Sequence, residues 1–207
     1  MRSPPFDLLI VSDGKPELLA RTRRVLAAVP AGRVAIQLRE RGLTSAALLA
    51  LASELRVLTE AHGALLVIND RVDIALAVGA DGVHLPEMGL PPEVARSLLG
   101  PSAWIGASRH DRSGLMQARE RGADYATLSP VHPVEGKAPA LGIVGFGALA
   151  RAVPLPIYAL GGVRLADARA LIDVGARGIA VMREVLSAGD PGASARRLLE
   201  ALNGADG

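Results

Sequence analysis

The chain has 207 residues, enough for one α/β domain, and half of them are hydrophobic although only 2% are aromatic. Its 23 Lys and Arg residues and 21 Asp and Glu residues give a formal charge of +2, and because both signs are interspersed we expect no nucleic-acid partner. The absence of cysteine excludes disulfides, thiolate metal sites and a cysteine nucleophile, and the lack of a secretory signal or a membrane-length apolar run predicts a cytoplasmic protein with no membrane partner.

Short apolar runs alternate with helical segments along the whole chain. Runs of aliphatic residues without polar alternation are typical of strands buried on both faces of a parallel sheet. The predicted strands are residues 8–11, 34–36, 65–68, 82–85, 104–107, 125–128, 157–160 and 178–181. The predicted helices are residues 18–28, 44–62, 71–78, 91–99, 111–121, 145–152, 165–174 and 192–203.

About eight strand and helix units follow one another with no linker or shift of composition between them. This pattern predicts a single-domain (β/α)₈ TIM barrel that spans residues 1–207. An open, doubly wound parallel sheet is the alternative, because alternation alone does not distinguish a closed sheet from an open one. In both architectures ligands bind at the C-terminal ends of the strands.

The third predicted strand ends abruptly in Asn69, Asp70 and Arg71, which makes Asn69 and Asp70 the first candidates for chemistry. The Asp70 carboxylate also suits an alternative role as the cap of the following helix. Polar residues and glycines follow the other strands as well, namely Asp13, Gln37, Arg39, Arg41, His84, Glu87, Ser108, His110, Lys137, Gly161, Gly162 and Arg183. Several cations and Gly-rich turns around one barrel mouth favour a ligand that carries phosphate groups.

Four segments carry a resemblance to a known family. They are Gln-Leu-Arg-Glu-Arg at residues 37–41, Ile-Asn-Asp-Arg-Val-Asp at 68–73, Ala-Asp-Gly-Val-His-Leu at 80–85 and Leu-Gly-Gly-Val at 160–163. In order and spacing the chain resembles the thiamine phosphate synthase family, which includes the related thiazole tautomerases, from about Leu8 to Leu202. The resemblance implies a TIM barrel in thiamine biosynthesis that joins hydroxymethylpyrimidine diphosphate to thiazole phosphate, with Mg²⁺ on the diphosphate.

The resemblance also implies a role for each matching residue. The pyrimidine substrate and its diphosphate would contact Gln37, Arg39, Arg41, Asn69, Ser108 and Lys137. The thiazole phosphate would contact Gly161, Gly162, Met182 and Arg183. Arg39, Ser108 and Lys137 would be the catalytic residues, and Asp70 would be the ligand of Mg²⁺. The implied mechanism is dissociative, because diphosphate leaves first and the thiazole nitrogen then captures a pyrimidine carbocation.

Several positions depart from the family pattern. Gly89 stands where the synthases have a second aspartate ligand, so Glu87 becomes the substitute ligand and we expect a weaker Mg²⁺ site. Arg41 replaces the usual lysine of the first motif, which keeps the charge and alters its geometry. Arg183 replaces a small serine, and it either adds a phosphate contact or blocks the pocket.

Two alternative functions stay open at this stage. A thiazole phosphate tautomerase, an isomerase, would need neither metal nor diphosphate, which the missing aspartate at Gly89 favours. Its catalytic histidine, however, corresponds to Pro130, and His132 lies two residues further on. The other alternative is a catalytically inactive barrel that binds a phosphorylated ligand. The sequence does not define the oligomeric state, and a homo-oligomer stays open.

Overall fold

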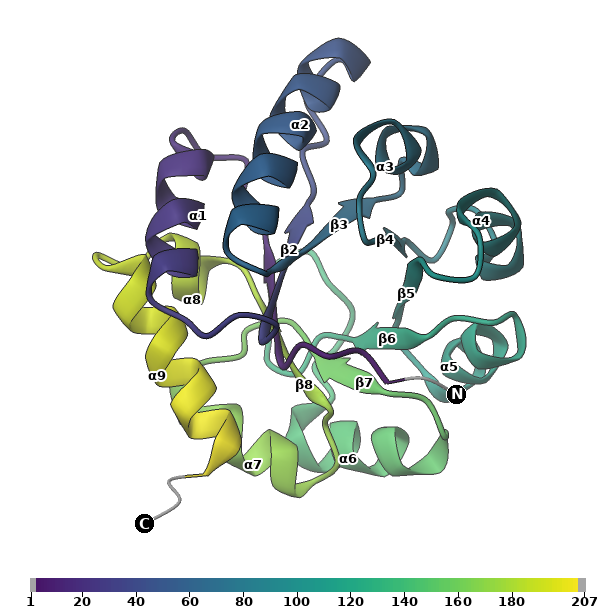
Figure 1. Ribbon diagram of the computed structural model, residues 1–207. Helices are drawn as coiled ribbons and strands as arrows, with labels where there is room; N and C mark the ends of the chain where they lie inside the picture. The colour runs from purple at the N-terminus through teal and green to yellow at the C-terminus, as the bar shows by residue number, and fades with distance from the viewer. Residues whose placement is uncertain (1–2, 205–207) are drawn as a thin grey trace.

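The computed structural model describes residues 3–204, and in this part of the chain eight parallel strands close into a barrel (Figure 1). The strands are β1 (Leu8–Val11), β2 (Val34–Leu38), β3 (Leu65–Asn69), β4 (Gly82–Leu85), β5 (Trp104–Arg109), β6 (Tyr125–Leu128), β7 (Ile157–Ala159) and β8 (Gly178–Val181). Each strand pairs with its sequence neighbours, and β8 closes the barrel on β1. The predicted closed barrel is therefore confirmed, and the open sheet is excluded.

Helices surround the barrel, as the alternating sequence pattern predicts. They are α1 (Leu18–Ala27), α2 (Ser45–Ala61), α3 (Val72–Val78), α4 (Pro92–Leu99), α5 (Arg112–Glu120), α6 (Gly142–Ala152), the 3₁₀ turn η1 (Leu165–Asp167), α7 (Ala168–Asp173), α8 (Arg183–Leu186) and α9 (Pro191–Asn203). Side chains cap several of them, since Thr44 Oγ1 accepts from the Ala47 amide at 3.3 Å and Asp111 Oδ1 from the Gly114 amide at 2.7 Å. Over residues 3–204 none of these helices combines the length and the apolarity of a membrane span.

Three aromatic side chains fill the N-terminal end of the barrel, and we call them the aromatic floor. Phe6 stacks on Tyr158 with ring centroids 4.9 Å apart, and Tyr125 packs edge-on against both. All three are fully buried, and the Tyr158 hydroxyl donates to the Phe6 carbonyl at 2.7 Å. The segment that contains Phe6 crosses this end of the barrel in Figure 1. Ligand space is thus left at the opposite end, where the strands terminate.

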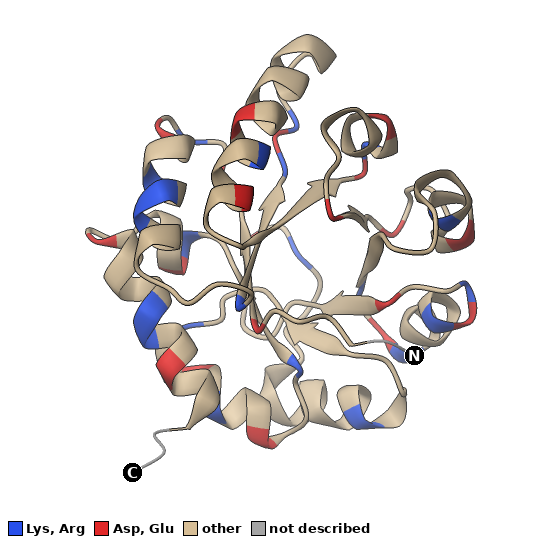
Figure 2. Cartoon of the chain, in the orientation of Figure 1, with Lys and Arg blue, Asp and Glu red and all other residues tan. Residues whose placement is uncertain are grey.

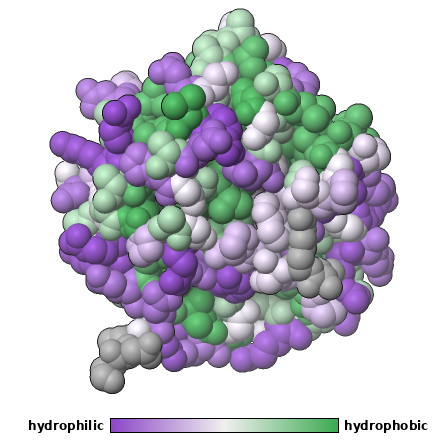
Figure 3. Space-filling model, in the orientation of Figure 1, coloured by the Kyte–Doolittle hydropathy of each residue, from purple (hydrophilic) through white to green (hydrophobic). Residues whose placement is uncertain are grey.

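The outer surface carries charges of both signs on its helices (Figure 2). Apolar atoms also reach this surface over α3 and α4 in Figure 3, where Leu76, Val94 and Leu98 are exposed. The barrel strands themselves are drawn almost entirely without charge in Figure 2. Basic side chains are in excess instead in the cavity at the C-terminal ends of the strands.

Candidate active site

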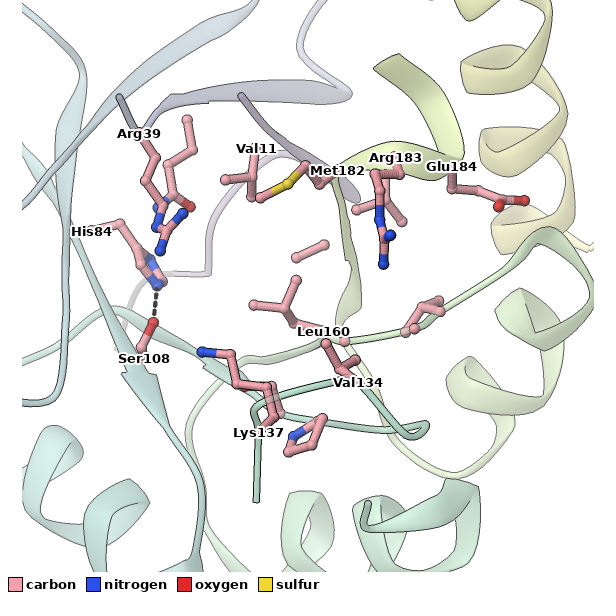
Figure 4. Close-up of a pocket in the computed structure, with 18 of the residues that line it drawn as sticks. Val11, Arg39, His84, Ser108, Val134, Lys137, Leu160, Met182, Arg183 and Glu184 are labelled. Atoms are coloured by element: carbon pink, nitrogen blue, oxygen red, sulfur yellow. Dashed lines mark hydrogen bonds between the residues drawn. The ribbon is translucent and has the colours of Figure 1, made fainter. Parts of the chain in front are cut away.

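A cavity of about 660 Å³ lies at the C-terminal ends of the strands (Figure 4). Side chains at or just after every strand end contribute to it, as the barrel geometry requires. The predicted site residues that line it are Gln37, Arg39, Arg41, Asn69, Glu87, Ser108, Lys137, Gly161, Gly162, Met182 and Arg183. Asp70 and Asp13 are the exceptions, because Asp70 lies beside the cavity and Asp13 is paired with Arg21 at 2.7 Å instead.

An amide pair joins the ends of β2 and β3. Gln37 Nε2 donates to Asn69 Oδ1 at 3.0 Å, and Gln37 is buried with 3% of its surface exposed. This bond fixes both side chains and leaves the Gln37 carbonyl oxygen and the Asn69 amide nitrogen for other partners. The pair can therefore offer one acceptor and one donor to a planar heterocycle.

A buried histidine organises the ends of β4, β5 and β6. His84 Nε2 lies 3.1 Å from Ser108 Oγ and 3.2 Å from Thr127 Oγ1, and Nδ1 lies 3.3 Å from the Tyr125 hydroxyl. Burial, reinforced by Arg109 and Arg39, lowers the pKa of His84 to about 3. The imidazole is therefore neutral at physiological pH and acts as a fixed hydrogen-bond partner of Ser108.

His84 is a packed side chain with only 1% of its surface exposed, and it also borders the cavity. Thr127 was not predicted as a site residue. It is the single hydroxyl-bearing aliphatic residue in an otherwise apolar strand, Tyr-Ala-Thr-Leu, which is the signal that identifies it in the sequence.

Basic side chains outnumber acidic ones in the cavity lining. The basic residues are Arg39, Arg41, Lys137, Arg164 and Arg183, and the acidic ones are Glu87 and Glu184. Figure 4 shows Lys137 reaching into the cavity toward the side of Arg39 and Ser108, while Arg183 points into it from the opposite side. The cavity therefore suits a ligand, or two ligands, with several negative charges.

The backbone of Arg39 is held in place, because its amide donates a hydrogen bond to Ser12 Oγ at 2.8 Å. Burial lowers the pKa of the Arg39 guanidinium, and repulsion from Arg41 adds to this effect. A guanidinium keeps its proton in proteins, so a partly buried charge results, with no ion-pair partner among residues 3–204. An anionic ligand would relieve that unfavourable state.

A glycine turn follows β7. Gly161 and Gly162 have left-handed φ values of 93° and 71°. A Cβ at Gly161 would lie 2.8 Å from Pro130 Cα, and one at Gly162 would lie 2.8 Å from His132 Cβ, so both space and conformation require glycine. Among residues 3–204 no acceptor is found for the amides of Gly161, Gly162 and Val163. Free amides at this position of a barrel are suited to binding a phosphate group.

Asp70 occupies a strained position at the end of β3, with φ of 65°. Its carboxylate accepts no hydrogen bond within the described residues, and α3 has Arg71 as its N-cap residue without a side-chain cap. The capping interpretation of Asp70 is therefore wrong. Gly89 faces this carboxylate, since a Cβ at Gly89 would lie 2.8 Å from Asp70 Oδ1.

These residues fit a Mg²⁺ ion held largely by a ligand's phosphates. Within residues 3–204 no cluster of three or more His, Cys, Asp or Glu side chains is arranged to hold a metal. Mg²⁺ in phosphate-binding sites, however, commonly takes one or two carboxylates, waters and phosphate oxygens. The unpaired Asp70 supplies one carboxylate, and Glu87, whose Oε2 is 4.0 Å from His110 Nε2, lines the adjacent cavity wall.

His110 and His132 also lie near the mouth of the barrel. His110 Nδ1 lies 2.7 Å from the Ser129 carbonyl at the cavity edge. His132 is directed toward Asp167, with Nε2 3.0 Å from Oδ2, and it is absent from the cavity lining although its neighbours Pro133 and Val134 belong to it.

The fold and site together define a TIM barrel with a basic cavity at its mouth that is suited to phosphorylated small molecules. Residues 8–185 match the sequence model of a family described as thiamine monophosphate synthase. The chain is 39% identical to thiamine-phosphate synthase of Moorella thermoacetica, over 99% of each chain, and 37% identical to that of Roseiflexus castenholzii, over 85% of this chain and 78% of the relative. It is also similar to the solved thiamine phosphate pyrophosphorylase from Pyrococcus furiosus, with a TM-score of 0.87 and 32% identity over 97% and 96% of the two chains. The chain belongs to the thiamine monophosphate synthase family.

Proposed function

We propose that the chain is a transferase that joins hydroxymethylpyrimidine diphosphate and thiazole phosphate to give thiamine phosphate and diphosphate. The names of its relatives support this reaction, since thiamine-phosphate synthases match it at 37% and 39% identity. The observation that carries the proposal is that one cavity contains two separate groups of donors suited to phosphate. Arg39 and Lys137 form one region, and the Gly161–Gly162 turn with Arg183 forms the other. Two phosphorylated substrates require two such regions.

The amide pair is the candidate holder of the pyrimidine ring. An aminopyrimidine has an amino donor beside a ring-nitrogen acceptor, and the free Gln37 oxygen and Asn69 amide nitrogen complement these groups. Because the two side chains fix each other, little ordering is needed when the ring binds.

Arg39, Lys137 and Ser108 would act on the leaving diphosphate. The bond between the pyrimidine methylene carbon and the diphosphate oxygen breaks, and its electron pair stays on that oxygen. Arg39 and Lys137 neutralise the charge that develops there, and Ser108, held by neutral His84, offers its hydroxyl. The lone pair of the thiazole nitrogen then forms the new bond to the methylene carbon.

Asp70 would hold Mg²⁺ on the diphosphate, with Glu87 as the candidate second ligand. When bound, the ion would add to the neutralisation of the leaving group. The unpaired Asp70 carboxylate and its position opposite Gly89 support this assignment.

Thiazole phosphate tautomerase is the second candidate, and the absence of a carboxylate at Gly89 favours it. The position of His132 opposes it, because its ring is directed to Asp167 and does not line the cavity. Lys137 also reaches into the cavity, where an isomerase of a monophosphate would have no diphosphate to bind.

The test is to incubate purified protein with both precursors, with Mg²⁺ or with EDTA, and to measure thiamine phosphate. We expect product with Mg²⁺ only, and a large loss in Lys137→Met, which keeps the length of the side chain without its charge. The absence of product at every Mg²⁺ concentration would reject the synthase, and proton exchange on thiazole phosphate alone would then establish the tautomerase.

A further inference from the structure

The Gly161–Gly162 turn needs support from outside itself. Glycine has the largest conformational freedom of any residue, so two successive glycines do not hold their amides in one direction unaided. A cradle that is ordered only when phosphate binds loses affinity to the cost of that ordering. The structure shows what contacts the turn on the side away from the cavity.

His132 packs directly behind the turn. Its backbone amide donates to the Gly161 carbonyl at 2.9 Å, and its Cβ would be only 2.8 Å from a Cβ placed on Gly162. The preceding residue continues the same ladder, with the Val131 amide donating to the Leu160 carbonyl at 3.0 Å. The loop after β6 is therefore joined to the turn after β7 along its length.

The His132 side chain extends this contact to the far end of the turn. Its Nε2 lies 3.0 Å from Asp167 Oδ2, and the same carboxylate oxygen accepts the Arg164 amide at 2.9 Å. His132 Nε2 is enclosed by protein and has no hydrogen-bond partner among residues 3–204, so Asp167 Oδ2 is its polar neighbour by proximity. The next amide, that of Leu165, donates to Glu184 Oε1 at 3.0 Å, which ties the segment to α8.

We propose that His132 and Asp167 form a brace that keeps the Gly161–Gly162 turn in its phosphate-binding conformation. The inference rests on the proposed function only in taking thiazole phosphate as the ligand of this turn. Both side chains lie outside the cavity lining, so they act through the turn and do not touch the substrate. They are positioning residues.

Two variants test the brace. His132→Phe keeps a flat ring behind Gly162 and removes Nε2, while Asp167→Asn keeps an oxygen for the Arg164 amide and removes the charge. We expect each to weaken thiazole phosphate binding by roughly 5- to 30-fold, the equivalent of ordering one backbone residue. Calorimetry should show inorganic diphosphate binding unchanged, because Arg39 and Lys137 do not contact the brace.

Kinetics and a double variant sharpen the result. The KM for thiazole phosphate should rise while kcat stays, and the double variant should be no weaker than either single one, since both remove the same contact. Asp173→Asn is the matched control, because it breaks the Arg169–Asp173 ion pair of 2.9 Å on the neighbouring helix without touching the turn.

An unchanged affinity for thiazole phosphate, or an equal loss of both ligands with a lowered Tm, would overturn the brace. Inorganic phosphate serves as a second probe, since it needs the turn alone. Failure of the wild-type protein to form thiamine phosphate would refute the proposed function separately. In that case an unchanged phosphate affinity in both variants would overturn the brace, and a selective loss would support it.

Discussion

Asp70 allows the metal role and the backbone role of one residue to be measured separately. Its left-handed conformation costs most L-residues about 1–2 kcal/mol, and Asp, Asn and Gly tolerate it best. Its carboxylate makes no hydrogen bond with the described residues, whereas its amide donates to the His84 carbonyl at 3.0 Å. Replacing the side chain by Asn, Gly or Ala keeps the backbone bond and removes the carboxylate in every case.

The three variants should therefore lose activity together and differ in stability. If Asp70 is a metal ligand, each should lose at least the roughly 10- to 100-fold that removal of an outer-shell partner costs. Asp70→Asn should unfold at the wild-type Tm. Asp70→Ala should be less stable by about 1 kcal/mol, which lowers the Tm by about 2–4 °C in a chain of this size.

Calorimetric unfolding and thiamine phosphate formation across a Mg²⁺ titration provide both readouts. Asp70→Gly is the internal reference, because it has no Cβ strain at a left-handed φ. Wild-type rate and Mg²⁺ dependence in Asp70→Asn would refute the metal role. A Tm lowered equally in the Asn and Ala variants would refute the argument that the Asp70 carboxylate does not stabilise the fold.

Three further outcomes are expected. Glu87→Gln should raise the Mg²⁺ concentration for half-maximal rate, and Gly89→Asp should lower it. Gly89→Ala is the control for the contacts that a Cβ makes with the Asp70 carboxylate and the Pro86 ring, and identical titrations would exclude Glu87 as a ligand. The pKa of His84 is near 6.5 in the unfolded state and about 3 in the folded state, so acid favours the unfolded state. Urea unfolding should therefore show a loss of about 3 kcal/mol in the free energy of unfolding between pH 7 and pH 4. His84→Gln should remove this pH-dependent loss. Arg183→Ser should raise the KM for thiazole phosphate about tenfold or more at unchanged kcat, as the loss of a charged hydrogen bond implies, whereas a lower KM would show that Arg183 obstructs the pocket.

The sequence was sufficient for the barrel and for most of the cavity. Apolar runs marked each strand, and the polar residues after them had to meet at one mouth because parallel strands share their direction. Gln37, Asn69, Ser108 and Lys137 were found in this way, and the structure brings them to the same cavity. Some element ends differ from the prediction, since β5 continues past residue 107 to Arg109 and α6 begins at Gly142, before residue 145.

The features that the sequence did not predict depend on backbone conformation and on contacts between residues far apart in the chain. The left-handed φ of Asp70 has no sequence signature, so the capping interpretation stayed open until the structure was known. The four-residue helix α8 is too short to produce a periodic pattern. His132 and Asp167 are distant in the chain and meet only because the loops after β6 and β7 are neighbours.

The aromatic floor also constrains the order of events during turnover. With the N-terminal end filled by Phe6, Tyr125 and Tyr158, ligands reach the described cavity through the mouth. If Gln37, which is 3% exposed, holds the pyrimidine and the exposed Gly162 holds the thiazole phosphate, as proposed, the pyrimidine lies the deeper of the two. In a passage with one entrance the deeper molecule must enter first. The packing of three rings at the far end therefore favours a compulsory sequence in which the pyrimidine precedes the thiazole and the linked product leaves with its thiazole half foremost.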